Sequence, residues 1–169
     1  MRRSFLSIIA AVLLAAFSGW TPPAQAKSSD EAAIRALLDN FRAAFRAKDL
    51  AKLMASYEPG ADFVAYDVIP PRQYAGTDAY KKDWEQTFDM FSGPITDDLV
   101  EQTIVADGNL AYSRSIEHVT GTFKAGGNMD MIVRVTDVYR KKNGKWLIIH
   151  EHVSVPVDLT TGKADMQSK

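Results

Sequence analysis

The second half of the chain alternates between apolar and polar residues with a period of two, and this pattern constrains the fold more than any other feature. Four such runs follow one another, over residues 99–106, 110–124, 129–141 and 145–155. The segments between them are typical of tight turns: Asp107-Gly108-Asn109, Ala125-Gly126-Gly127 and Asn143-Gly144. We therefore predict four successive strands that form an antiparallel meander.

The residues before this meander have the spacing of helices. Apolar residues recur at intervals of three and four after Asp30, namely Ile34, Leu37, Leu38, Phe41 and Phe45. A shorter helix is expected from Asp49, and another amphipathic helix from Thr77. Between them, residues 61–68 alternate and predict a strand that stops before Pro70-Pro71. Helices followed by a sheet indicate an α+β fold with the helices on one face of the sheet.

The first 26 residues have the features of a cleavable signal peptide. Arg2 and Arg3 are positively charged, Phe5 to Phe17 is an apolar run, and Ala24-Gln25-Ala26 provides the small residues that a signal peptidase needs. The run is shorter than the roughly 20 residues of a membrane-spanning helix. We predict a periplasmic or secreted protein that begins at Lys27 and has no membrane partner after cleavage. The arginine pair leaves open the secretory and the twin-arginine export routes.

Composition restricts the partners and the chemistry of the remaining chain. Cleavage removes two of the 20 basic residues and none of the 21 acidic ones, which leaves 143 residues with a net charge of −3. Such a length suits one domain, and the charge argues against a nucleic-acid partner. The chain has no cysteine, so disulfides and thiol catalysis are excluded. We predict one domain over residues 27–156, a flexible tail over residues 157–169, and no cofactor.

The order of elements resembles the nuclear transport factor 2-like superfamily, in particular its SnoaL-like and ketosteroid isomerase-like branch. Four segments carry the resemblance: Val68-Ile69-Pro70-Pro71-Arg72-Gln73-Tyr74, Gly76-Thr77-Asp78-Ala79-Tyr80, Val133-Arg134-Val135-Thr136-Asp137, and residues 146–156. The last segment is also similar to the association domain of calcium/calmodulin-dependent protein kinase. The resemblance implies a cone-shaped half-barrel, in which a curved antiparallel sheet wraps around N-terminal helices and one capping helix.

The same resemblance implies that the ketosteroid isomerase mechanism is not retained. That mechanism needs a carboxylate that moves a proton, and a tyrosine and a protonated aspartate that hold the enolate oxygen. The tyrosine position falls on Phe41 and the general-base position on Ala65, so that only the aspartate has a counterpart, Asp137. Asp67 lies two residues after Ala65 on the same strand face and could replace the base. The alternative is that Asp67 simply begins the following turn.

Turn geometry suggests the floor of a pocket. If Phe123 pairs with Asn128 across the glycine-rich turn, Arg114 lies directly opposite Asp137 and forms a polar floor with it. Aromatic side chains are expected to provide the walls and to bind the ligand: Phe41, Phe63, Tyr80 and Trp84.

The last strand has two possible registers. A two-residue Asn143-Gly144 turn places His150 opposite Asp137, whereas a three-residue loop with a bulge turns Glu151 inward, which the resemblance favours. In the second register, His150 and His152 share the outer face, where related domains dimerise. No metal site is expected at this histidine pair, because a third ligand is not evident.

Three functions remain open from these observations. The first is an exported protein that binds a small organic molecule in an aromatic-lined pocket. The second is an isomerase, dehydratase or cyclase that uses Asp67 or Glu151 as base and Asp137 as acid. The third is a structural oligomerisation module. In each case we expect a homodimer formed through the outer face of the meander.

Overall fold

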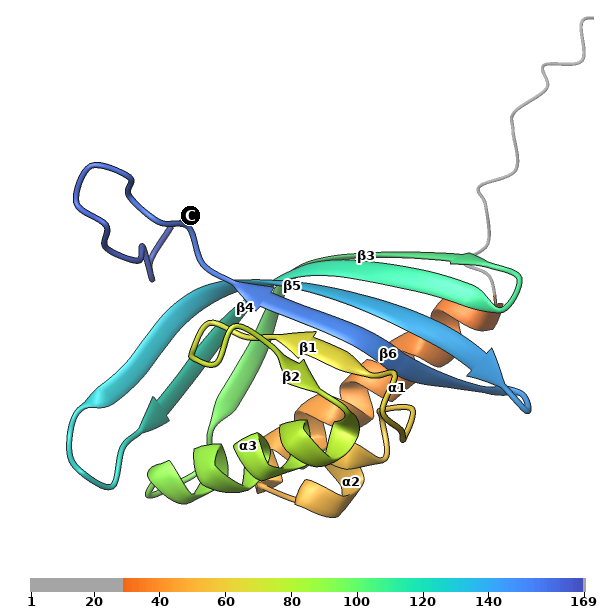
Figure 1. The fold of residues 1–169 in the computed structure, drawn as a ribbon, viewed down its shortest axis with the longest axis horizontal. Helices are drawn as coiled ribbons and strands as arrows, with labels where there is room; N and C mark the ends of the chain where they lie inside the picture. The colour runs from red at the N-terminus through yellow and green to blue at the C-terminus, as the bar shows by residue number, and fades with distance from the viewer. Residues whose placement is uncertain (1–28, 169) are drawn as a thin grey trace, which may run out of the picture.

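The computed structural model describes residues 29–168 (Figure 1). Its elements are α1 (Ser29–Ala47), α2 (Leu50–Met54), β1 (Val64–Tyr66), β2 (Tyr74–Ala75), α3 (Thr77–Met90), β3 (Thr96–Asp107), β4 (Leu110–Thr122), β5 (Asn128–Lys142) and β6 (Lys145–Ser154). The predicted signal peptide lies outside the described residues. Between residues 29 and 168, no helix has both the length and the apolar character that crossing a membrane requires.

The six strands form one sheet in the order β2-β1-β6-β5-β4-β3. Strands β3 to β6 are the predicted antiparallel meander, whereas β1 joins its edge in parallel with β6. The sheet is bent and does not close, and the three helices lie on its concave side (Figure 1). The predicted α+β class and the cone-shaped half-barrel are therefore confirmed.

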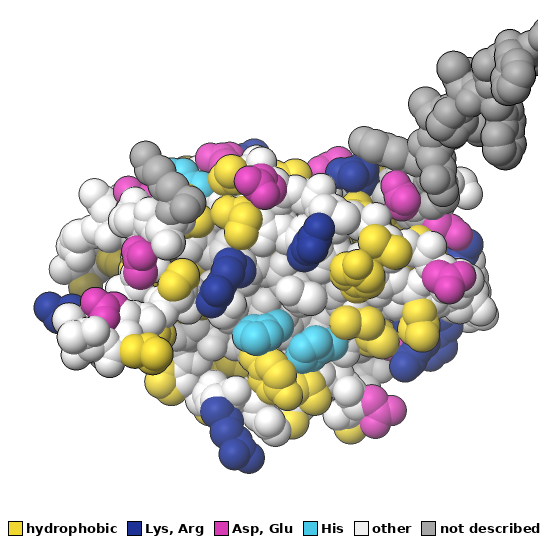
Figure 2. All heavy atoms as spheres, turned by 90° about the horizontal axis from the view of Figure 1, so that it is seen from above, with side chains coloured by type: hydrophobic (Ala, Val, Ile, Leu, Met, Phe, Trp, Pro, Cys, Tyr) yellow, Lys and Arg dark blue, Asp and Glu magenta, His cyan; other side chains and the backbone are white. Residues whose placement is uncertain are grey.

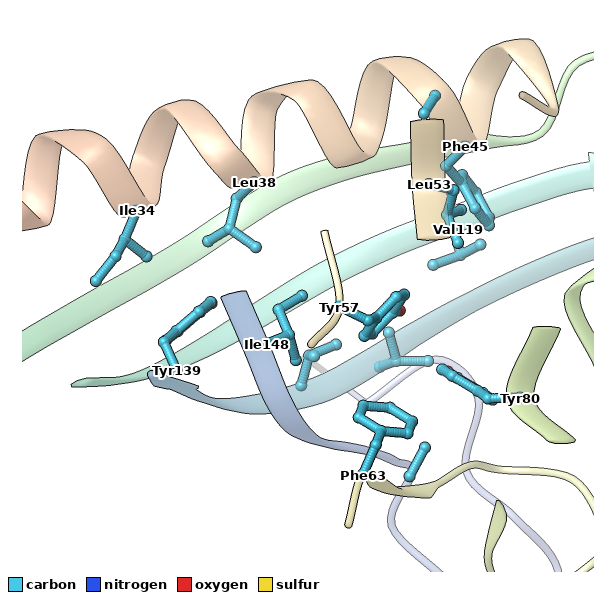
Figure 3. Close-up of a cluster of buried hydrophobic side chains, with 14 of the residues drawn as sticks. Ile34, Leu38, Phe45, Leu53, Tyr57, Phe63, Tyr80, Val119, Tyr139 and Ile148 are labelled. Carbon is cyan, nitrogen blue, oxygen red and sulfur yellow. The ribbon is translucent and has the colours of Figure 1, made fainter. Parts of the chain in front are cut away.

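The helices are held against the sheet by the apolar stripe that the sequence indicates. Ile34, Leu38 and Phe45 of α1 are buried and point toward the strands (Figure 3). Tyr57 and Ile148 fill the space beneath them and are almost fully buried. Each large apolar side chain buried in this way contributes roughly 1.5–3 kcal/mol. This core packs α1 against the sheet, and Phe45 at its edge also lines a cavity.

The C-terminal segment folds back toward the sheet after β6. A turn is closed by the Asp158 N–H, which donates to the Lys163 carbonyl at 2.9 Å. Further on, the Ile132 N–H of β5 donates to the Met166 carbonyl at 2.8 Å. Met166 thereby reaches the cavity between the helices and the sheet. The mobility of this tail stays a prediction.

Candidate functional site

A cavity of about 330 Å³ lies between α1, α3 and the concave face of the sheet. Phe41 and Trp84 form one wall, with their rings edge to face at a centroid distance of 6.2 Å. Methionines from β5 and from the C-terminal segment, Met129, Met131 and Met166, also line it. The volume is at the lower end of the range for small-molecule sites, and a mainly apolar wall is typical of such sites.

Four carboxyl groups interrupt these apolar walls: Asp67, Asp97, Glu117 and Glu151. They come from the segment after β1 and from β3, β4 and β6, so that residues up to 84 positions apart in the chain converge on one space. The described lining residues include no lysine, arginine or histidine. The cavity therefore combines apolar walls with an excess of acidic groups.

Glu151 is the most tightly held of these carboxyl groups. The Tyr57 hydroxyl donates to its Oε2 at 2.9 Å, and the Tyr80 hydroxyl donates to its Oε1. Burial raises the pKa of Glu151 well above its usual range, and the nearby Asp137 raises it further, while the two tyrosines oppose the shift. Glu151 is therefore biased toward its protonated form on the cavity wall.

A bulge in β6 is what turns Glu151 inward. The β5–β6 hairpin has a two-residue turn, since Lys142 pairs with Lys145, but the register shifts at Ile149, so that Asp137 pairs with Glu151. The expectation of an inward Glu151 is therefore confirmed, although the extra residue lies within the strand rather than in the loop. His150 and His152 face outward, where both rings contact Tyr66.

The two histidines of β6, His150 and His152, do not line the cavity. Between residues 29 and 168, no group of three or more His, Cys, Asp or Glu side chains is arranged to hold a metal ion. His150 Nδ1 instead lies 2.7 Å from the Val64 carbonyl oxygen. The histidines therefore belong to the outer surface, which Figure 2 shows as a mixture of histidine, basic and hydrophobic side chains.

Asp137 is buried but does not line the cavity. It borders a smaller void of about 20 Å³, which Glu151 also borders. The Tyr139 hydroxyl donates to Asp137 Oδ2 at 2.9 Å, and the Ser113 hydroxyl approaches the same oxygen at 3.4 Å. Burial raises the pKa of Asp137 to about 7. Asp137 can therefore affect the cavity through Glu151 rather than by touching a ligand.

The prediction that Arg114 lies opposite Asp137 is wrong. Ser113 pairs with Asp137, and Arg114 pairs with Thr136 on the outer face, where its side chain is exposed. The β4–β5 ladder ends at Thr122, one residue earlier than expected, and this slip moves Arg114 to the other face. Phe123 lies beyond the end of this ladder, and its ring stacks on that of Phe91 at a centroid distance of 4.6 Å.

Asp67 lies on the cavity wall and also forms the turn, so the two interpretations of this residue are compatible. Its Oδ1 accepts a hydrogen bond from the Val68 N–H at 2.6 Å, and the carboxyl group borders the cavity. Burial raises the pKa of Asp67 to about 6. A carboxyl group with such a pKa exchanges protons near neutral pH, which is the property a general base requires.

Of the predicted aromatic residues, three are on the cavity and one is not. Phe41, Trp84 and Tyr80 line the cavity. Phe63 instead lies behind Tyr80, stacked against its ring at a centroid distance of 5.6 Å, and does not reach the cavity. The expected role of Phe63 in ligand contact is therefore corrected to a role in the core.

Sequence reasoning missed an ionic cluster at the cavity. Arg42 Nη2 lies 3.4 Å from Glu117 Oε1, and Arg42 Nε lies 3.7 Å from Asp97 Oδ2. The Ser115 hydroxyl donates to Glu117 Oε1 at 2.6 Å. A signal for Arg42 was available, since it lies four residues after the buried Leu38 and thus on the apolar stripe of α1. Glu117 was missed because the predicted register of β4 was wrong by one residue, which turned Glu117 to the outer face.

The sequence of this chain matches a known family. The family model of the SnoaL-like domain matches residues 34–158. The chain belongs to the SnoaL-like family. No curated protein matches this SnoaL-like chain.

Solved structures agree with this assignment. A nuclear transport factor 2-like protein of unknown function from Pseudomonas putida KT2440 is 33% identical, with 83% of this SnoaL-like chain and 96% of that chain covered and a TM-score of 0.74. Two others show the fold alone. A nuclear transport factor 2-like superfamily protein from Salmonella enterica has 18% identity, coverages of 78% and 94%, and a TM-score of 0.68. A ketosteroid isomerase-like protein from Erwinia carotovora atroseptica has 22% identity, coverages of 75% and 96%, and a TM-score of 0.63.

Proposed function

We propose that this SnoaL-like domain binds a small, mainly apolar organic molecule in the cavity between α1, α3 and the sheet. The observation that carries this proposal is a cavity of about 330 Å³ whose aromatic and methionine walls are interrupted by a few carboxyl groups. Apolar walls supply binding energy by removing ligand surface from water, and the carboxyl groups orient the ligand. Binding of this kind needs no metal or cofactor.

A thermal-shift screen with neutral, acidic and basic aromatic compounds tests this proposal. A ligand at a hundredfold excess over its dissociation constant stabilises the native state by roughly 2.7 kcal/mol. For a domain of this size, that corresponds to a rise in Tm of roughly 5–10 °C. If no compound in a broad screen raises the Tm, a structural oligomerisation module becomes the better interpretation.

A matched pair of variants locates the binding site. Met131 lines the cavity, so that Met131→Trp fills part of it and should abolish the shift. Val100 lies on β3 with an exposed fraction of 58%, and Val100→Trp adds the same bulk outside the cavity and should leave the shift unchanged. Equal shifts in both variants would place the ligand elsewhere and contradict the proposal.

A second candidate function is proton transfer on the bound molecule. It is favoured by Asp67, a cavity carboxyl group with a pKa of about 6. In this reaction the Asp67 carboxylate removes a proton from a carbon next to a carbonyl group, and the electron pair moves onto the carbonyl oxygen to form an enolate. Glu151 lines the same cavity and is biased toward its protonated form, so that it can donate a hydrogen bond to that oxygen.

Deuterium exchange tests this second function. Ligands from the screen that contain a carbonyl group are incubated in D₂O, and mass spectrometry follows uptake of deuterium at the neighbouring carbon. Uptake that is catalysed by the protein and lost in Asp67→Asn supports proton transfer. If deuterium is taken up no faster with the protein than without it, proton transfer is contradicted and ligand binding remains the proposed function.

We also propose that the protein is exported and forms a homodimer through the outer face of the sheet. Export is supported by the Ala24-Gln25-Ala26 cleavage pattern, and N-terminal sequencing of the periplasmic protein should begin at Lys27 rather than at Met1. Dimerisation is supported by the mixed polar and apolar outer surface (Figure 2). Light scattering that reports a monomer at micromolar concentration would contradict it.

A further inference from the structure

The charge around the cavity is unbalanced in the region of Arg42. Asp97 and Glu117 both line the cavity, and the single guanidinium group of Arg42 lies against both of them. Burial, and next the neighbouring Glu117 carboxyl, raise the pKa of Asp97 to about 7. Above about pH 7, the two carboxylates that share one cation therefore retain one negative charge. A buried charge without a counter-charge is costly, so that a cation entering the cavity would be stabilised there.

Asp97 is a cavity carboxyl group with a buried oxygen that no donor satisfies. Glu117 accepts hydrogen bonds from Ser115 and Arg42, and Glu151 accepts from two tyrosines. The side chain of Asp97 is only 6% exposed, and its Oδ1 accepts no hydrogen bond from any residue between 29 and 168. Its Oδ2 lies 3.7 Å from Arg42 Nε, which is longer than a hydrogen bond. Asp97 Oδ1 is thus a buried acceptor without a donor, in a side chain that borders both the apolar cavity and the void of about 20 Å³.

The aromatic walls of the same cavity favour a positively charged group as well. Trp84 and Phe41 line the cavity together with Phe91, which lies near the start of β3. The faces of such rings attract cations by roughly 0.5–2 kcal/mol, depending on how far the cation is removed from water. An anion would instead meet four carboxyl groups and no basic side chain among the described lining residues.

We infer that the cavity selects a small apolar amine, whose N–H groups donate to the Asp97 carboxylate and whose apolar body packs against Phe41 and Trp84. This inference rests on the proposed binding function and specifies the class of ligand. It predicts that a carboxylic acid with the same apolar body is rejected. One alternative satisfies Asp97 Oδ1 without a ligand, namely a proton held between the Asp97 and Glu117 carboxyl groups.

Three probes that share the same apolar body distinguish an amine-selective cavity from a proton shared by two carboxyl groups. They are 3-phenylpropylamine, 3-phenylpropan-1-ol and 3-phenylpropanoate. Their affinities for the purified protein are measured by isothermal titration calorimetry at about pH 8, where the amine is charged. We expect the amine to bind about ten- to hundredfold more tightly than the alcohol, because a hydrogen bond to a charged group is stronger than one between neutral groups. The acid should bind most weakly.

Two neighbouring variants provide the matched control. Asp97→Asn removes the charge at the cavity and should reduce the affinity for the amine to that for the alcohol. Asp98→Asn removes the next carboxylate, whose side chain is 64% exposed and pairs with Arg46, and should leave all three affinities unchanged. Unchanged affinity of Asp97→Asn for the alcohol shows that the variant is folded.

The outcomes distinguish this inference from the function on which it rests. If amine and alcohol bind equally to the wild-type protein, or if Asp97→Asn and Asp98→Asn lower the amine affinity to the same extent, the inference is wrong while the binding function stands. If none of the three probes binds and the wider screen is also negative, both are wrong.

Discussion

Replacing Asp67 with asparagine measures the free-energy cost of holding a carboxylate at the cavity wall. Burial raises the pKa of Asp67 from 3.8 to about 6 in the folded protein. The folded state therefore binds this proton more tightly than the unfolded state does. The stabilisation from Asp67 is fully present below about pH 4 and is lost as the pH rises through about 6.

The size of the effect follows from the shift in pKa. A difference of about two units corresponds to about 3 kcal/mol, at 1.36 kcal/mol per unit. Asparagine stays neutral at every pH, and its Oδ1 can still accept the hydrogen bond from the Val68 N–H. We therefore expect Asp67→Asn to unfold with a free energy up to about 3 kcal/mol higher than that of the wild type above about pH 7.

Denaturant unfolding between about pH 4 and pH 8 measures this difference. The difference in free energy of unfolding between Asp67→Asn and the wild type should be largest at high pH and should approach zero near pH 4. Asp62→Asn is the control, because Asp62 is exposed and nearby in the chain, and its variant should follow the wild-type profile. A difference between Asp67→Asn and wild type that does not change with pH would refute this account of Asp67.

Two further substitutions test the packing around the cavity. Tyr80→Phe removes one of the two hydroxyl groups that donate to Glu151, and should lower the free energy of unfolding by about 1–3 kcal/mol. Its control is Tyr66→Phe on the exposed face, which should have almost no effect. Gly121→Ala places a Cβ atom 2.8 Å from Cδ1 of Phe91 and should cost about 1–3 kcal/mol, whereas Gly93→Ala meets no atom within 4 Å and should be nearly neutral. Denaturant unfolding measures both pairs, and equal effects within either pair would contradict the packing described.

Much of the fold is predictable because it depends on local patterns. The meander follows from alternating residues and from turn sequences such as Asn143-Gly144, whose backbone preferences act over a few residues. The long helix follows from apolar spacing, and Ile34, Leu38 and Phe45 are buried as that spacing predicts. Resemblance to a family added the inward direction of Glu151.

The composition of the candidate site was decided by tertiary structure. Sequence reasoning predicted Asp67, Glu151, Phe41, Tyr80 and Trp84 at the cavity, and the structure brings these five together. It placed Arg114, Asp137 and Phe63 there as well, although none of the three lines the cavity, and it missed the cluster of Arg42, Asp97 and Glu117. That cluster joins α1, β3 and β4, and contacts between residues 55 and 75 positions apart leave no local pattern in the sequence.

Register changes in two strand pairs, β4–β5 and β5–β6, explain why the polar residues of the site were only partly predictable. A strand pattern with a period of two determines which residues share a face, but not which of the two faces points inward. That choice depends on where the ladder begins and on any extra residue within it. Phe123 lies beyond the ladder and packs against Phe91, which follows α3, and Ile149 forms a bulge within β6. The sequence by itself therefore determined the strands and helices, while packing between distant segments decided which polar residues face the cavity.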